Sequence, residues 1–193
     1  MMSSNTYAAR SGHRTGQSNI RQKDRVRWMA LTGVLMGMNV AMCAFSIPVP
    51  GGHLYLNDVV ICTAALLMDA PAAFLVGGVG AMIGDMLFYP VAMFVSLFAH
   101  GLQAVAVSLI YHKLISTESG ARNKKAAAVA AALVGAVIMV TGYTLGKIYV
   151  YSTFEYAMIK LPYEIAQALL GVAGSVALCF RGKLMEYFAR MDF

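Results

Sequence analysis

Polar and ionisable side chains recur inside the most apolar stretches of this chain, at spacings that could hold a polar ligand or move a proton. Three pairs are three or four residues apart, which places both members of a pair on one face of a helix: His100 with Gln103, Tyr143 with Lys147, and Glu164 with Gln167. Asp85 stands alone in a Gly-rich apolar run. His53, Asn57 and Asp58 belong to a polar interruption, PVPGGHLYLNDVV.

Catalytic and metal-binding patterns do not accompany these residues. The sequence has no HExxH motif and no nucleophile elbow, so we predict no catalytic residue, no metal and no cofactor. Cys43, Cys62 and Cys179 lie in apolar runs without CxxC spacing and are interpreted as small core residues. An intramembrane acid–base set of His100, Asp85 and Glu164 remains a competing enzyme hypothesis.

Composition decides the class of protein. Of 193 residues, 59% are hydrophobic and 12% are charged, with a mean hydropathy of +0.65. A soluble domain has roughly 25% charged residues, so this chain is predicted to be an all-α integral membrane protein.

Six apolar segments predict six transmembrane helices. They are 28–47, 57–68, 71–88, 91–115, 126–148 and 161–180. We expect residues 1–27 to form a basic tail that is disordered or only locally helical, residues 28–181 to form the transmembrane domain, and residues 182–193 to form a C-terminal tail.

The second segment is too short for an ordinary crossing. Ten residues separate Asp58 from the loop residue Asp69, which is about 15 Å of helix. Either this helix is half-length, or Asp58 lies in a polar cavity below the membrane surface.

Basic residues predict the orientation. Six alternating spans place thirteen of the fifteen Lys and Arg residues on one side and leave only Lys147 and Lys160 near the other. Both termini are therefore expected in the cytoplasm of a multi-pass plasma-membrane protein.

This topology brings the polar residues together in the outer half of the membrane. Ionisable groups are costly in hydrocarbon unless they face a partner or the bundle interior. A channel would distribute such groups across the whole thickness, so the pattern favours a binding pocket that opens to the outside. A stand-alone ion-coupled transporter remains an alternative, although no inverted repeat is evident.

Two Gly-containing features could serve movement and assembly. Gly51 and Gly52 lie in the external loop and would let it close over the pocket as a lid, unless the loop is a passive connector. Gly33, Gly37 and Ala41 are spaced by four in the first segment, a pattern typical of close helix contact either inside the bundle or with a separate subunit.

Four stretches resemble a known family. IPVPGGHLYLNDVVICTAALLM, GGVGAMIGDMLFYP, AHGLQAV and LPYEIAQALLG are similar to the substrate-binding S components of energy-coupling factor (ECF) transporters, in the riboflavin-type group that includes hydroxymethylpyrimidine carriers.

The resemblance covers residues 28–181 and implies a six-helix prokaryotic subunit with an external vitamin pocket and a lid. It implies no ATPase in this chain, but partnership with a transmembrane coupling subunit and two cytoplasmic ATPases. It also implies that Gly33, Gly37 and Ala41 form the docking surface.

Departures from the family pattern bear on the substrate. Glu164 stands where the family often has Asn, and His100 stands where it often has Lys. A carboxylate suits the exocyclic amine of an aminopyrimidine, so we expect hydroxymethylpyrimidine, with pyridoxine or riboflavin as alternatives.

Overall fold

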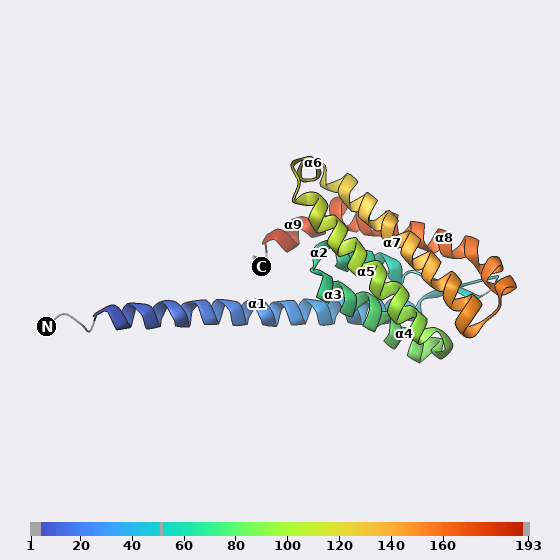
Figure 1. Cartoon of the computed structure of the whole chain (residues 1–193), viewed down its shortest axis with the longest axis horizontal. Coiled ribbons are helices and arrows are strands. Elements are labelled where there is room, and N and C mark those ends of the chain that lie inside the picture. Colours follow the sequence, from blue (N-terminus) through green and yellow to red (C-terminus); the bar gives the residue numbers. More distant parts are fainter. Residues whose placement is uncertain (1–4, 51, 191–193) are drawn as a thin grey trace.

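Helices that match the predicted apolar segments account for most of the structure, a computed structural model that describes residues 5–50 and 52–190 (Figure 1). In that part of the chain, five helices are long and apolar enough to cross a bilayer, and one shorter apolar helix accompanies them. The predicted all-α membrane class and the six helical segments are therefore confirmed.

The first half of the fold comprises one long helix, a hairpin and two further membrane segments. The elements are α1 (Asn5–Ala44), β1 (Ser46–Val49), β2 (Gly52–Tyr55), α2 (Asn57–Leu67), and then α3 (Ala70–Phe74), the π-helical η1 (Leu75–Val79) and α4 (Gly80–Phe88).

The second half comprises three long segments and two short helices. The elements are the 3₁₀ turn η2 (Pro90–Ala92) with α5 (Met93–Ile115), α6 (Glu118–Arg122), α7 (Lys124–Gly146) with the π-helical η3 (Lys147–Tyr151), α8 (Phe154–Val176) with the π-helical η4 (Ala177–Arg181), and α9 (Leu184–Arg190).

The basic N-terminal segment corrects one expectation. From Asn5 onward it is the first half of α1 and not a disordered tail. A membrane-embedded helix already supplies the nucleus, so adding residues costs only propagation, and no proline interrupts residues 5–27.

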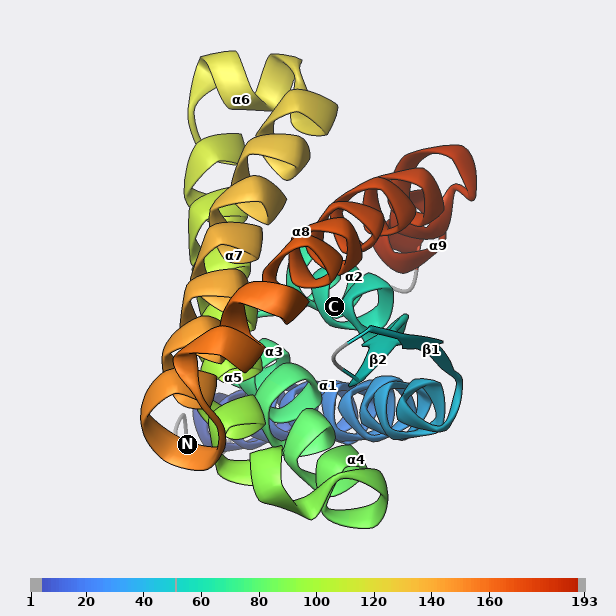
Figure 2. The same ribbon diagram turned by 90° about the vertical axis from the view of Figure 1, so that its right-hand side faces the viewer.

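The second segment is a half-length helix, and its start is also buried. The helix α2 has 11 residues, about 16 Å of length, and Asp58 in its first turn is 1% exposed. Figure 2 shows α2 between α8 and α1. Both readings of Asp58 therefore hold: the helix is short, and the carboxylate lies among polar groups inside the protein.

The loop that we expected on the outside is an antiparallel hairpin. Residues of β1 and β2 pair from Ser46↔Tyr55 to Val49↔Gly52, so the first apolar segment ends at Ala44 and not at residue 47. A two-stranded sheet tolerates Pro48 because β1 has a free edge. Of the two predicted hinge glycines, Gly52 begins β2, whereas Gly51 lies outside the described residues.

The last membrane helix begins earlier than predicted. Its N-cap is Thr153, whose side chain accepts a hydrogen bond from the Tyr156 N–H, and Pro162 lies inside the helix. Proline usually ends a helix, which is why the sequence suggested a start at 161. Glu164 is consequently three turns into α8 and not one.

The two ends of the bundle differ in character. In Figure 1 the hairpin, the end of α4 and the start of α8 lie at one end, while α6, α9 and the N-terminal half of α1 lie at the other. The basic loop around α6 thus shares an end with α9 and the basic part of α1, as the charge pattern predicted.

Glycine at position 171 permits the closest crossing of α8 over α2, and replacing it with alanine should destabilise the fold. A Cβ there would lie 2.7 Å from the Asp58 Cβ. We expect Gly171→Ala to cost about 1–3 kcal/mol through overpacking, measured by thermal unfolding in detergent.

Gly33→Ala is the matched control, because a Cβ at Gly33 meets no atom within 4 Å. It should leave stability unchanged or raise it slightly, since alanine is the better helix former. Equal unfolding temperatures for both variants would show that the α2–α8 crossing is not tight.

Candidate binding site

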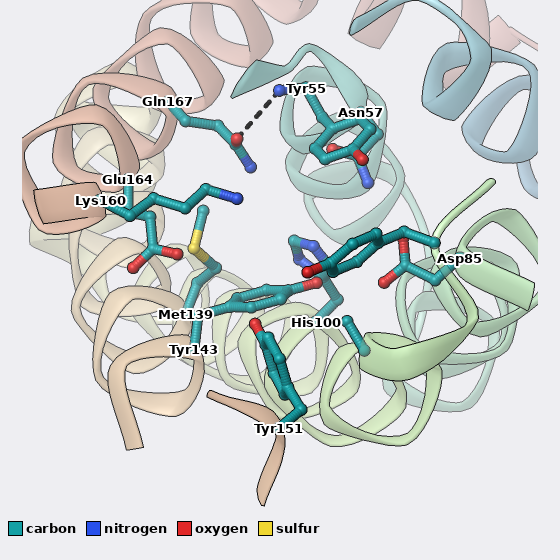
Figure 3. A pocket seen from close by; sticks show the side chains of 12 residues that line it. Tyr55, Asn57, Asp85, His100, Met139, Tyr143, Tyr151, Lys160, Glu164 and Gln167 are labelled. Carbon is teal, nitrogen blue, oxygen red and sulfur yellow. Dashed lines mark hydrogen bonds between the residues drawn. The ribbon is translucent and has the colours of Figure 1, made fainter. Parts of the chain in front are cut away.

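A pocket lies at the hairpin end of the bundle, where five of the six membrane segments and the hairpin converge (Figure 3). Its free volume is about 30 Å³. The lining side chains are Tyr55, Asn57, Asp85, Tyr89, Ala92, His100, Met139, Tyr143, Tyr151, Lys160, Glu164 and Gln167.

Six of the ten predicted ligand-binding residues line this pocket: Asn57, Asp85, His100, Tyr143, Glu164 and Gln167. Three more, Asp58, Gln103 and Lys147, are buried behind the lining and bonded to it. His53 is exposed on β2 opposite Pro48 and does not line the pocket.

An ion pair joins the last two long helices beside the pocket. Lys147, which is 0% exposed, donates to Glu164 Oε1 and also to the Tyr143 carbonyl at 3.3 Å. Its ammonium lies 5.2 Å from the centre of the Tyr143 ring. A buried ammonium is tolerable in a membrane protein only with such partners. Glu164 Oε2 has no hydrogen-bond partner among the described residues.

A second polar cluster surrounds Asp58 at the start of α2. Asp58 Oδ1 accepts from Gln103 Nε2 at 2.8 Å, and Oδ2 accepts from Gln167 Nε2 at 2.6 Å. His100 Nδ1 lies 2.7 Å from Gln103 Oε1 and 3.7 Å from Asp58 Oδ1. These contacts satisfy both carboxylate oxygens and fix the orientation of His100.

Gln167 also connects this cluster to the hairpin. Its Oε1 accepts a hydrogen bond from the Tyr55 backbone N–H at 3.0 Å, while its Nε2 donates to Asp58 (Figure 3). One amide therefore holds the last residue of β2 against the membrane-embedded core. Movement of the hairpin away from the pocket would have to break this bond.

A third cluster lies on the opposite wall. The Ser96 hydroxyl donates to Asp85 Oδ2 and is hydrogen-bonded to the Tyr143 hydroxyl. The Tyr143 ring also packs edge-on against His100, with 5.2 Å between ring centres. Tyr143 thus contacts all three clusters.

Asn57 offers a further acceptor to the pocket. Its Nδ2 contacts Cys43 Sγ at 3.7 Å, and its Oδ1 has no partner in the described part of the chain. Asn57 Oδ1 and Glu164 Oε2 are two buried acceptors with unused capacity in one lining. Buried oxygens of this kind favour a ligand that donates hydrogen bonds.

Sequence reasoning missed half of the lining: Tyr55, Tyr89, Ala92, Met139, Tyr151 and Lys160. The tyrosines belong to loops and helix ends, where they look like ordinary interfacial residues. Burial raises the pKa of Tyr55 to about 12, so its phenol stays protonated and able to donate. Lys160 could be recognised as a lining residue only once the true start of α8 was known. With that start, Lys160 lies in the same helix as Glu164, one turn before it.

No group of three or more His, Cys, Asp or Glu side chains in residues 5–50 and 52–190 could hold a metal ion. The cysteines Cys43, Cys62 and Cys179 are free and buried. The chemistry available in the pocket is hydrogen bonding, aromatic contact and electrostatic attraction.

Two comparisons with known proteins both match S components of ECF transporters. A family model described as "ECF-type riboflavin transporter, S component" matches residues 23–182. A solved structure described as "Structure and mechanism of the S component of a bacterial ECF transporter" superposes with a TM-score of 0.63 at 14% identity, covering 81% of this chain and 95% of that one. At this identity the structural match shows the fold alone. No curated protein matches the sequence.

Gln167→Leu should loosen the hairpin, because it removes the amide that bonds both Tyr55 and Asp58. We expect faster amide hydrogen exchange in the hairpin strands, by about fivefold, if the bond contributes about 1 kcal/mol.

The matched control is Gln103→Leu, which also removes a bond to Asp58 but has no contact with the hairpin. If both variants accelerated exchange in the hairpin equally, Gln167 would have no special role in holding it.

Proposed function

Because the chain belongs to the ECF-type riboflavin transporter S component family, we propose that it captures a B vitamin or vitamin precursor for import. The family comprises substrate-binding membrane subunits of transporters. The proposed partners are a transmembrane coupling subunit and two cytoplasmic ATPase subunits, which would supply the energy.

The observation that carries this proposal is the polar pocket at one end of an otherwise apolar bundle. Its three hydrogen-bonded clusters centre on Asp58, Asp85 and the Lys147–Glu164 pair. A membrane protein keeps such groups at one depth when they serve a binding site. The cytoplasmic-side core, by contrast, is built from residues such as Ile61, Leu66 and Val107.

We infer that the pocket faces outward and that both termini are cytoplasmic, in the plasma membrane of a prokaryote. The support is the distribution of charge between the two ends of the bundle. Arg25, Arg27, Lys124 and Lys125 lie at the starts of the membrane-spanning parts of α1 and α7, away from the hairpin.

We propose hydroxymethylpyrimidine as the first substrate to test, with pyridoxine and riboflavin as alternatives. An aminopyrimidine carries an exocyclic amine with two N–H donors. Asn57 Oδ1 and Glu164 Oε2 are two fully buried acceptors of the lining without a partner in the described residues. The tyrosines of the lining would pack against a small aromatic ring.

The hairpin is proposed to act as the lid. About 30 Å³ of free space is far smaller than an aromatic vitamin, so entry requires part of the lining to move. The hairpin is tied to the core at Tyr55 by the Gln167 amide, and breaking this bond would help to free it to move.

The docking surface for the coupling subunit is proposed to be the open face of α1. Alanine-sized additions at Gly33 or Gly37 would meet no atom within 4 Å, and Ala41 is exposed. Val34 and Met38 beside them are 60% and 49% exposed. These small residues do not pack against the rest of the bundle, and this supports docking to another protein rather than internal packing.

Replacing Glu164 with Gln should weaken aminopyrimidine binding about ten- to a hundredfold, because a charge-assisted hydrogen bond contributes roughly 1.5–3 kcal/mol. Titration calorimetry of purified protein with hydroxymethylpyrimidine, pyridoxine and riboflavin gives the affinities.

Glu155→Gln is the control, since Glu155 is an exposed carboxylate in the first turn of the same helix. It should bind every vitamin like the unmodified protein. Unaltered affinities in Glu164→Gln would remove Glu164 from the binding site, and the absence of binding to any of the three vitamins would argue against the proposed substrates.

Gly37→Leu should abolish assembly with the coupling subunit while leaving vitamin affinity unchanged, because it fills the open ridge without approaching the pocket. Co-purification with the partner subunits and calorimetry on the isolated chain measure the two properties. A variant that assembles normally would show that α1 does not dock there.

A further inference from the structure

Lys160 is the one ammonium among the described side chains that line the pocket, and none of these described side chains forms an ion pair with it. It lies on α8 one turn before Glu164, is half-buried, and extends toward the middle of the pocket (Figure 3). No hydrogen bond or ion pair joins it to any residue in the described ranges 5–50 and 52–190. The charges that face it are Lys147, Glu164 and Asp85.

The neighbouring carboxylates already have other partners. Glu164 is bonded to Lys147 through Oε1, and Asp85 is bonded to Ser96 through Oδ2. Lys147 shows what a satisfied ammonium needs in this environment, namely a carboxylate and a backbone carbonyl. Lys160 has neither, although desolvation also disfavours its charged form.

Counting formal charges limits what can satisfy Lys160. With His100 counted as neutral, the charged groups around the pocket are three carboxylates, Asp58, Asp85 and Glu164, and two ammonium groups, Lys147 and Lys160. An anionic ligand would add a negative charge to a site that already has an excess of carboxylates. A neutral ligand with a strong acceptor can bond Lys160 without that repulsion.

We propose that Lys160 is a specificity-determining residue that binds an acceptor oxygen of a ligand with no net charge. The ligand spans the pocket, with N–H donors toward Asn57 and Glu164 and its oxygen toward Lys160. This inference rests on the proposed function and narrows it to small heteroaromatic compounds that carry donors and an oxygen acceptor on one ring.

The test compares Lys160→Met with the unmodified protein, since methionine keeps a long unbranched side chain and removes the charge. The probes are hydroxymethylpyrimidine, the same aminopyrimidine with methyl in place of hydroxymethyl, and the phosphate monoester of hydroxymethylpyrimidine. Pyridoxine and its analogue lacking the ring hydroxyl form a second pair.

The unmodified protein should bind each oxygen-bearing compound at least tenfold more tightly than its analogue without the oxygen, and Lys160→Met should bind both alike. The phosphate monoester should bind at least tenfold more weakly than the alcohol. An unchanged preference in Lys160→Met would overturn the proposal, and tighter binding of the phosphate would overturn its claim of a neutral ligand.

Thermal unfolding without ligand separates this role from a structural one. Removing an unpaired ammonium should leave the unfolding temperature of Lys160→Met equal or higher, whereas Lys147→Met, which strands Glu164, should lower it. A drop in Lys160→Met as large as that in Lys147→Met would mean that the fold needs Lys160, and would overturn the proposal. If no vitamin bound the unmodified protein, the proposed function would fail together with this inference.

Discussion

The burial of Asp58 is the constraint on which the rest of the structure depends. A carboxylate that is 1% exposed inside a membrane protein must receive hydrogen bonds from the protein, because lipid cannot supply them. Gln103 from α5 and Gln167 from α8 supply them, and Gln167 in turn holds the end of β2. One buried charge therefore sets the relative positions of two long helices, the short helix α2 and the hairpin.

The same need for internal partners explains why a pocket exists at that end. Polar groups that satisfy one another leave oriented side chains, and some of their atoms stay unused: Glu164 Oε2 and Asn57 Oδ1 have no partner in the described part of the chain. The opposite half of the core consists mainly of alanines and aliphatic residues, together with Tyr111 and Cys179, and offers few polar groups to a ligand. Ligand recognition and fold stability thus draw on one set of side chains at the hairpin end.

Hydropathy predicted the membrane segments well because the bilayer itself fixes their length and apolarity. Helical spacing likewise brought Glu164 with Gln167 and His100 with Gln103 into one site. The sequence could not reveal the hairpin, whose strands are four residues long and include Pro48. Pro162 concealed the true start of α8 at Phe154, and this error hid Lys160, because its relation to Glu164 is visible only when both belong to one helix. Partners such as Lys147 for Glu164 come from different segments, so spacing along the chain could not identify them.

The glycines of this chain fall into two groups: some lie where helices cross closely inside the bundle, and others lie on an open face of α1. At Gly84, Gly146 and Gly171 a Cβ would lie within 2.7 Å of another segment, so these glycines let helices cross closely inside the bundle. At Gly33 and Gly37 nothing lies within 4 Å, so the fold gains nothing from their small size and loses about 1 kcal/mol of helix propensity at each. Contact with another surface, as in the proposed docking to a coupling subunit, would give these small residues a use. Because this face of α1 contributes no side chain to the pocket lining, a partner could bind it without touching the ligand.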